Sequence, residues 1–463
     1  MKRSITMLGV VALLLVSLSH AEQRWERNYG GTGDDYGYSV QQTTDGGYIV
    51  AGTTRSFGSA GQVYLIKTNA SGDTLWTKTY GGASDDIGRS VRQTSDGGYI
   101  VAGYTESFGN DEQVYLIKTN AFGNTLWTRT YGGASADRAF SVQQTSDGGY
   151  AVAGYTASFG HGGVDIYLIK TNASGDTLWT RAIGEARNDY GYSVQQTMDG
   201  GYVVAGLSYS FVQPQVYLIK TNASGDTLWI QNYGGADDDY GWSVQQTTDG
   251  GYIVTGATWS FGNYVQVYLI KTDKDGVALW DLTYGGASND WGYSVQQTTD
   301  GGFIVAGFAY SFGNFYQVYL IKTNAGGDTL WTRIYGGAGD DYGRSVQQTS
   351  DGGYVVAGET SSFGNGSQVY LIKTDANGSS GVEERTEGRR QKAEGRLTAK
   401  PNPFTSFAAI PGHEAERFSL YDISGRKVGT YKGDRVGEGL SPGVYFLRPE
   451  DQSAKPVRIV KVR

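Results

Sequence analysis

The chain has 463 residues, among them 71 Gly and 35 Tyr but only 7 Pro and no Cys. Turn-forming Gly combined with β-favouring aromatic residues indicates an all-β protein, and the absence of Cys excludes disulfides, thiolate metal sites and a cysteine nucleophile. Residues 22–378 carry 35 acidic and 20 basic side chains, and this negative balance argues against nucleic acid as a partner.

The first 21 residues have the pattern of a secretory signal peptide. A charged start at Lys2 and Arg3 precedes an apolar run at 7–18 and the small-x-small sequence Ser19-His20-Ala21. The apolar run is too short to span a bilayer, and no later run is long enough. We therefore expect an exported protein without a transmembrane segment.

Residues 22–378 contain seven copies of one repeat. Its Trp markers are Trp25, Trp76, Trp127, Trp179, Trp229, Trp280 and Trp331. In the second copy, runs rich in Val, Ile, Tyr and Thr are separated by turns with Gly, Asn or Asp, which predicts strands at 88–95, 99–107, 113–120 and 125–133. Strands such as Val-Tyr-Leu-Ile are apolar on both faces and need a sheet on each side. We predict a seven-bladed β-propeller of four-stranded blades.

The two ends of the array predict how the ring closes. The chain begins with a lone fourth strand at 23–31 and ends with a third strand at 368–378 that no Leu-Trp strand follows. We expect the N-terminal strand to complete the last blade. A solenoid, the alternative, would leave that strand unpaired.

The repeat also resembles a known family. The segment 80–103, YGGASDDIGRSVRQTSDGGYIVAG, has a GG…D loop, a strand, a DG turn and a strand ending in Val-Ala-Gly. This order is similar to the SBBP family of bacterial β-propeller repeats, and the resemblance covers nearly all of 25–374. It implies the architecture and carries no known chemistry.

A charged linker at 379–396 leads to a different C-terminal domain at 397–463. Six of the seven Pro lie in this last part, and its short strands and turns predict a small β-sandwich. Its motifs are KPNPF (400–404), FSLYDISGRKV (418–428), LSPGVYFLR (440–448) and VRIVKVR (457–463). In this order they resemble the type A C-terminal sorting domain of the type IX secretion system. The resemblance implies a Gram-negative bacterium, the secretion machinery as partner, passage across the outer membrane, and removal of the domain with release or surface attachment.

One face of the propeller is the better candidate for binding. The loops joining strand four to strand one and strand two to strand three lie on the same face of such a fold. Both length changes in the array fall in the second of these loops, a residue gained at 161–165 and one lost at 211–215. Long, variable loops on a rigid scaffold are typical binding elements.

One Asp recurs in the opening loop of every copy. These residues are Asp35, Asp86, Asp137, Asp189, Asp239, Asp290 and Asp341. As a ring at the channel mouth they would suit a cation such as Ca²⁺, and no other cofactor is expected. Alternatively, each accepts N–H groups within its own Gly-rich loop. We favour this scaffold role, because the blades share a fold but not a ligand, and we expect Asp238 to act only within its loop.

A Lys also recurs in every copy, in the Tyr-Leu-Ile-Lys run. We expect these side chains to pair with the carboxylates of the turns on the opposite face. They are Lys67, Lys118, Lys170, Lys220, Lys271, Lys322 and Lys373.

Aromatic residues break the sevenfold pattern. The Trp residues outside the marker positions are Trp242, Trp259 and Trp291. The position before Ser-Phe is aromatic in three adjacent blades, as Tyr209, Trp259 and Tyr310, and Tyr264, Phe315 and Tyr316 lie in neighbouring loops. An exposed aromatic patch beside carboxylates suits sugar or peptide binding. Packing is the alternative for Trp242 and Trp291, which occupy positions that are aromatic in most blades.

Enzyme chemistry has little support in the sequence. His161 is the only His of the propeller, so neither a Ser-His-Asp arrangement nor a His-rich metal site is expected. We predict a secreted or cell-surface binding or adhesion module that is not an enzyme. The alternatives are a carboxylate-based glycan-active enzyme on the same face and a purely structural surface protein.

Overall fold

The computed structural model describes residues 24–210, 213–381, 409–410, 416–422, 426–449 and 457–461. The chain divides into two compact units, residues 1–382 and 383–463. The predicted signal peptide and most of the predicted linker lie outside the described residues. Within the described ranges, no helix is long and apolar enough to cross a membrane.

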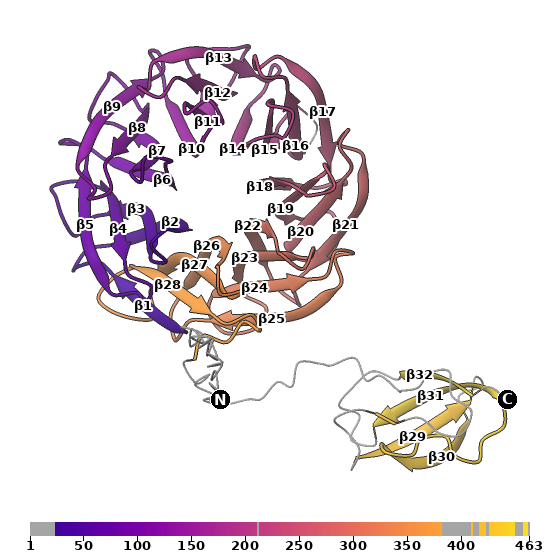
Figure 1. Cartoon of the computed structure of the whole chain (residues 1–463). Helices are drawn as coiled ribbons and strands as arrows, with labels where there is room; N and C mark the ends of the chain where they lie inside the picture. Colours follow the sequence, from indigo (N-terminus) through magenta and orange to yellow (C-terminus); the bar gives the residue numbers. More distant parts are fainter. Residues whose placement is uncertain are drawn as a thin grey trace, which may run out of the picture. The chain divides into compact units, whose positions relative to one another are not determined.

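The first unit consists of seven four-stranded antiparallel sheets arranged as a ring of blades (Figure 1). Blade 1 contains β2 (Asp35–Gln42), β3 (Tyr48–Thr54), β4 (Gln62–Thr68) and β5 (Thr74–Tyr80), and blade 2 contains β6 (Asp86–Gln93), β7 (Tyr99–Thr105), β8 (Gln113–Thr119) and β9 (Thr125–Tyr131). Blade 3 contains β10 (Asp137–Gln144), β11 (Tyr150–Thr156), β12 (Asp165–Thr171) and β13 (Thr177–Ile183), and blade 4 contains β14 (Asp189–Gln196), β15 (Tyr202–Ser208), β16 (Gln215–Thr221) and β17 (Thr227–Tyr233). Blade 5 contains β18 (Asp239–Gln246), β19 (Tyr252–Thr258), β20 (Gln266–Thr272) and β21 (Ala278–Tyr284), and blade 6 contains β22 (Asp290–Gln297), β23 (Phe303–Ala309), β24 (Gln317–Thr323) and β25 (Thr329–Tyr335). The predicted all-β, seven-bladed propeller is confirmed.

The seventh blade combines the two ends of the unit. It contains β26 (Asp341–Gln348), β27 (Tyr354–Thr360), β28 (Gln368–Thr374) and the N-terminal β1 (Trp25–Tyr29). Strand β1 pairs antiparallel with β28, with Trp25 opposite Lys373. Trp25 also packs edge-on against Tyr48 of blade 1 at 5.7 Å between ring centroids, and the Tyr29 hydroxyl donates to Gly72 O at 2.6 Å. The predicted closure by the N-terminal strand is therefore present, and it ties blade 7 to blade 1.

The innermost strands hold neighbouring blades together around the axis. Val91 N–H of blade 2 donates to Ser39 Oγ of blade 1 at 3.2 Å. The same bond recurs at every junction and includes the closing one, from Val40 N–H to Ser345 Oγ at 3.2 Å. Apolar side chains fill the space between adjacent blades, so the core is a series of inter-blade layers.

Each innermost strand contains a β-bulge at its fourth residue. In β2 the register shifts between Gly37 and Ser39, and the other six blades show the same shift. A bulge re-aims the side chain of the extra residue. The bulged residues, which we call the channel ring, are Tyr38, Arg89, Phe140, Tyr192, Trp242, Tyr293 and Arg344. Six neighbouring pairs of this ring are in aromatic or cation–π contact, as with Arg89 lying 4.3 Å from the Tyr38 ring centroid.

Seven ion pairs, each with a buried Lys, lie on the face with the tight turns. Lys67 is 3% exposed, and its Nζ lies 2.9 Å from Asp45 of the turn between β2 and β3. The other six repeated Lys make the same pair. The pairing expected from the sequence is thus present in every blade.

The second unit is described in part. Its strands β29 (Arg417–Asp422), β30 (Lys427–Lys432), β31 (Gly443–Pro449) and β32 (Val457–Lys461) form one antiparallel sheet in the order β30-β29-β31-β32. Phe418, Leu420 and Leu447 are among the residues of its small core. The described residues of this unit form this one sheet, so the predicted sandwich stays a prediction, and the KPNPF motif lies outside the described residues.

Candidate functional site

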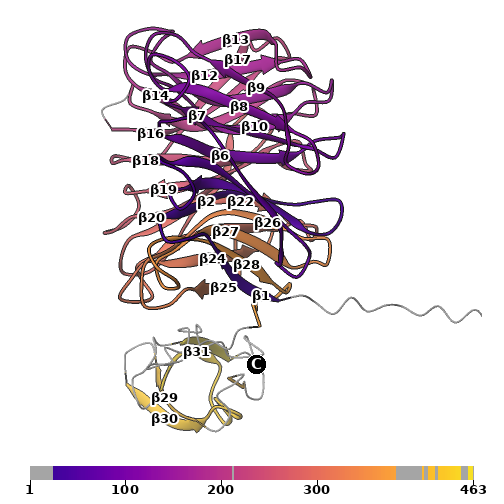
Figure 2. The same cartoon turned by 90° about the vertical axis from the view of Figure 1, so that its left-hand side faces the viewer.

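The two longer loops of each blade meet on one face of the ring. The strands run roughly along the ring axis (Figure 2), so the connections collect at its two ends. The loop after β3 lies against the loop that enters blade 2: Arg55 pairs with Asp85 at 2.6 Å, and Asp86 N–H donates to Gly61 O at 2.8 Å. We call this the long-loop face.

The seven repeated Asp side chains lie in separate loops of the long-loop face. All are fully buried. The Oδ2 atom of Asp35 accepts Gly31 N–H at 2.8 Å and the Ser56 hydroxyl at 2.5 Å, and each of the other six accepts the N–H four residues before it. Burial raises the pKa of Asp239 and Asp341. Among the described residues, no three or more His, Asp or Glu side chains form a group that could hold a metal ion. Each of these carboxylates thus accepts hydrogen bonds within its own loop, which is the arrangement that the scaffold interpretation expects.

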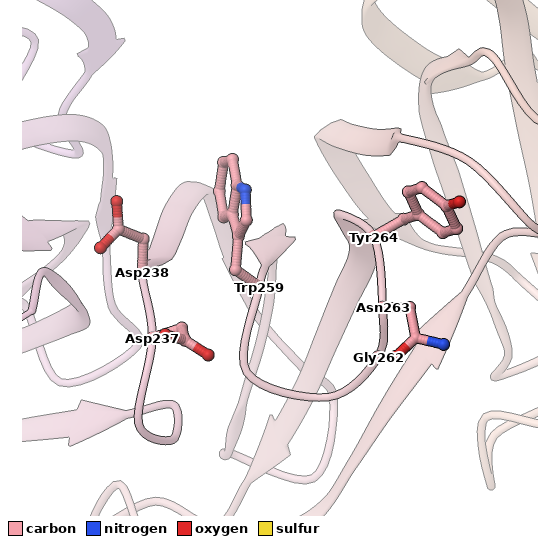
Figure 3. A pocket seen from close by; sticks show the side chains of 6 residues that line it. All are labelled: Asp237, Asp238, Trp259, Gly262, Asn263 and Tyr264. Carbon is pink, nitrogen blue, oxygen red and sulfur yellow. The ribbon is translucent and has the colours of Figure 1, made fainter.

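A hollow of about 420 Å³ lies on the long-loop face at blade 5. Its lining residues are Asp237, Asp238, Trp259, Gly262, Asn263 and Tyr264. The Trp259 indole stands upright between the segment of the two aspartates and the loop that carries Asn263 and Tyr264 (Figure 3). Tyr264 is 49% exposed. Two of the predicted ligand-binding residues, Trp259 and Tyr264, thus border the same hollow.

Two further aromatic rings hold Trp259 in place. The Tyr240 ring lies 5.1 Å from Trp259 at an interplanar angle of 66°, and Trp291 lies 4.9 Å from it at 88°. Both are edge-to-face contacts of the kind that aromatic pairs prefer. Trp291, another predicted residue, therefore supports Trp259. Because both supporting rings come from the innermost strands β18 and β22, the indole is fixed by the rigid part of the blades.

The remaining predicted aromatics do not line this hollow. Trp242 belongs to the channel ring, packed between Tyr192 at 4.3 Å and Tyr293 at 5.1 Å. It also lies 5.9 Å from the Tyr240 ring, so it packs among aromatic side chains, as the packing alternative expects. Tyr310 contacts Tyr316 at 5.1 Å.

Phe315 and Tyr209 complete the predicted set. Phe315 is exposed. Tyr209 lines a second hollow of about 490 Å³ with residues that include Arg187 and Asn188. Ring contacts link several of the predicted residues, because Tyr240 contacts both Trp242 and Trp259, and Phe308 joins Trp291 to Tyr316. Trp259 and Tyr264 are the two that line the hollow at blade 5.

The carboxylates beside Trp259 were not among the predicted ligand-binding residues. The sequence assigns Asp238 a role within its own loop, whereas in the structure its carboxylate lines the hollow and accepts the Tyr240 hydroxyl at 3.3 Å. Asp237 and Asn263 line the same hollow. A signal was present in Pro214, the only Pro of the propeller, which has no N–H to donate and whose carbonyl accepts Asp239 N–H at 2.8 Å.

Comparison with known proteins supports the fold class. A beta-propeller domain of unknown function (DUF5122) matches residues 349–380, and no curated protein matches the chain. Among solved structures, the chain is similar to Sqt1 from Chaetomium thermophilum, with 11% identity, 96% of this chain and 99% of that chain covered, and a TM-score of 0.47. It is also similar to the WD40 domain of Neurospora crassa Pan2, with 10% identity, coverage of 74% and 98%, and a TM-score of 0.44.

A third similar structure is PorZ, a surface component of the type IX secretion system of Porphyromonas gingivalis. It has 11% identity, coverage of 90% of this chain and 69% of that chain, and a TM-score of 0.35. Similarities at this level carry no inference about ligands or partners. Together with the seven sheets, the family match defines the first unit as a β-propeller repeat domain.

Proposed function

We propose that this protein is a non-catalytic binding module whose ligand site is the hollow at Trp259. One observation carries the proposal: an indole held by two inner-strand aromatics stands in a cavity of about 420 Å³ beside two carboxylates. A flat, rigid aromatic ring stacks on a sugar or peptide group at little entropic cost. The carboxylates and the Asn263 amide add hydrogen-bonding groups that orient such a ligand.

The same lining residues favour binding over catalysis. They include no His, Ser, Lys or Cys, so a Ser or Cys nucleophile activated by His or Lys is not present among them. The carboxylates of Asp237 and Asp238 also line the hollow. Because paired carboxylates can hydrolyse glycosidic bonds, the test also measures hydrolysis of a bound glycan.

Binding to glycan and peptide arrays tests the proposal. The variants are Trp259→Ala and, as a control, Phe122→Ala, which removes an aromatic side chain that is 71% exposed in a turn of the opposite face. We expect array binding by the unmodified protein and by the control, and its loss in Trp259→Ala. Retained binding in Trp259→Ala would remove the hollow as the site. Turnover of a bound glycan would favour the enzyme, and no binding at all would favour a structural surface protein.

We further propose that the chain is exported by the type IX secretion system and then released or attached to the cell surface. The support is the signal-peptide pattern of residues 1–21 and the order of the four C-terminal motifs. In a bacterium with this system, deletion of residues 397–463 should retain the protein in the periplasm, and fusion of the same residues to a periplasmic reporter should export it. Export of the truncated chain would refute the assignment.

A further inference from the structure

Five blades bind the side chain before the repeated Asp in the same way. In blade 2, Asp85 Oδ1 accepts Gly61 N–H at 2.7 Å, and in blade 7, Asp340 Oδ1 accepts Tyr316 N–H at 3.0 Å. Asp34, Asn188 and Asn289 accept the corresponding N–H. In each case the donor is the residue immediately before the third strand of the preceding blade. In each of these five side chains the Oδ1 atom accepts this hydrogen bond, which fixes the side chain against the loop of the preceding blade.

Asp238 differs because the residue before β16 is Pro214. Proline has no N–H, so the bond that fixes the other five side chains cannot form. Pro214 keeps its backbone position, since its carbonyl accepts Asp239 N–H at 2.8 Å as in the other blades. What changes is the side chain of Asp238, whose one hydrogen bond within the described ranges comes from the Tyr240 hydroxyl at 3.3 Å.

No cation neutralises the carboxylates of this hollow within the described part of the chain. Asp85, the equivalent carboxylate of blade 2, pairs with Arg55 at 2.6 Å. The position of Arg55 is occupied in blade 4 by Tyr209 and in blade 5 by Trp259. Asp238 and the neighbouring Asp237 are in no ion pair among the described residues, and the hollow that they line contains no Lys or Arg.

We propose that the hollow at Trp259 selects a cationic group, such as a Lys or Arg side chain of a peptide ligand. The inference rests on the proposed function and names its ligand class. An ammonium or guanidinium group is attracted to the face of an indole, which is the best aromatic partner for a cation. It would at the same time replace the missing N–H donor and the missing cation at Asp238. The excess of acidic residues on the propeller, 35 against 20 basic, also favours the approach of a positively charged ligand.

Calorimetric titration of the full chain with capped tripeptides tests the ligand class. The probes are acetyl-tri-lysine-amide, its counterpart with Nε-acetylated lysines, acetyl-tri-glutamate-amide, and maltopentaose as a neutral sugar. We expect tri-lysine to bind and the acetylated and glutamate peptides to bind about fivefold more weakly, which is the upper end of the contribution of one exposed ion pair. Raising the ionic strength should weaken the tri-lysine interaction, because salt screens exposed charges.

Three variants separate the contributions. Asp238→Asn should weaken tri-lysine binding about fivefold, and Trp259→Ala should weaken it about tenfold. Pro214→Ala removes no ligand-contacting group but restores the N–H, so it should draw Asp238 into the loop and weaken binding as Asp238→Asn does. Asp34→Asn is the matched control, because its side chain already accepts Ser367 N–H at 2.9 Å, and it should leave binding unchanged.

Two results would overturn the inference: equal affinity for tri-lysine and its acetylated counterpart, or unchanged tri-lysine binding in both Asp238→Asn and Pro214→Ala. If maltopentaose or an array ligand then still requires Trp259, the proposed binding site stands and only the cationic preference fails. If Trp259→Ala affects no ligand, the proposed function fails as well.

Discussion

Replacing Asp165 by Gln should stabilise the propeller. The first residue of the third strand is Gln in six blades, and each Gln Nε2 donates to a carbonyl of the loop that enters the next blade, as from Gln113 to Gly133 O at 3.2 Å. In blade 3 this residue is Asp165, which is 1% exposed. Its Oδ2 accepts His161 N–H at 3.0 Å, whereas its Oδ1 is buried without a hydrogen-bond partner.

A second buried carboxylate makes Asp165 costly. An ideal Cβ on Gly184 would stand 2.2 Å from Asp165 Oδ1 and 2.6 Å from Asp189 Oδ2, so the two carboxylates face the same small space. Two unit charges about 5 Å apart repel by about 3 kcal/mol at an effective dielectric constant of about 20. A restored amide hydrogen bond contributes about 1 kcal/mol. The Asp165–Asp189 pair relieves part of its repulsion by taking up protons. We therefore expect Asp165→Gln to raise the free energy of unfolding by about 2 kcal/mol, which is about 3 °C in Tm for a unit of this size.

The pH dependence gives a second signature. Burial, and then repulsion by Asp189, raises the pKa of Asp165, and burial also raises that of Asp189. A carboxyl whose folded-state pKa is raised destabilises the fold at pH values above that pKa, and this cost disappears as the pH falls toward the unfolded value of 3.8. The unmodified protein should therefore gain stability on going from pH 7 toward pH 4, and Asp165→Gln should gain less.

Thermal unfolding followed by circular dichroism at pH 7 and pH 5 measures both effects. The reciprocal variant Gln113→Asp, which places a carboxylate beside Asp137, is the matched control and should lower Tm. A lower Tm for Asp165→Gln at pH 7 would refute the reasoning, because it would mean that the carboxylate has a stabilising partner. Repeating the melts with Ca²⁺ and with chelator would then show whether that partner is a cation.

Three further predictions concern the scaffold. Burial alone would raise the pKa of Asp96, but hydrogen bonds from groups that include Lys118 lower it to about 2. The ionised Asp96 therefore stabilises the fold above pH 3.8, and this stabilisation is lost as the pH falls from 3.8 toward 2. Thermal melts from pH 5 to pH 2 should show Tm falling in this window, with a smaller fall in Lys118→Met. Trp242→Ala should reduce the free energy of unfolding in urea by about 3 kcal/mol without changing tri-lysine binding, and a loss of binding would assign Trp242 to the site. Deletion of residues 24–31 should abolish the cooperative thermal transition, and a synthetic peptide of these residues should restore it; an unchanged transition would contradict closure by β1.

The repetition made the fold predictable. Seven copies of the same turns and apolar runs fixed the number of blades and strands, and the lone strand at each end fixed the closure. The boundaries were less accurate where the backbone is irregular. The first strand of blade 2 was predicted at 88–95 but spans Asp86–Gln93, because Asp86 already pairs with Thr105 before the bulge that follows Gly88.

The candidate site was only partly predictable for a physical reason. Comparison of the copies identifies Trp259, because the residue type at each equivalent position can be read from the sequence alone. The state of Asp238 depends instead on a backbone donor in the preceding blade, 24 positions earlier in the chain. The position of Trp242 could not be predicted either. A β-bulge places it in the channel ring, and its residue type does not indicate a bulge.

Three departures from sevenfold symmetry fall on consecutive blades of the long-loop face. Asp165 lies at the end of the lengthened loop of blade 3, Pro214 at the end of the shortened loop of blade 4, and Trp259 follows in blade 5. The opposite face keeps its Lys–Asp pair in all seven blades, and the inner strands keep their inter-blade bonds. Such a closed scaffold tolerates a local loss of about 2 kcal/mol because a cooperative unit distributes its stability over many contacts. A repeat protein can therefore carry destabilising side chains such as Asp165 on one face, because the bonds between the blades keep the ring intact. This makes the irregular face, rather than the sevenfold ring of aspartates, the place where a specific ligand is recognised in our proposal.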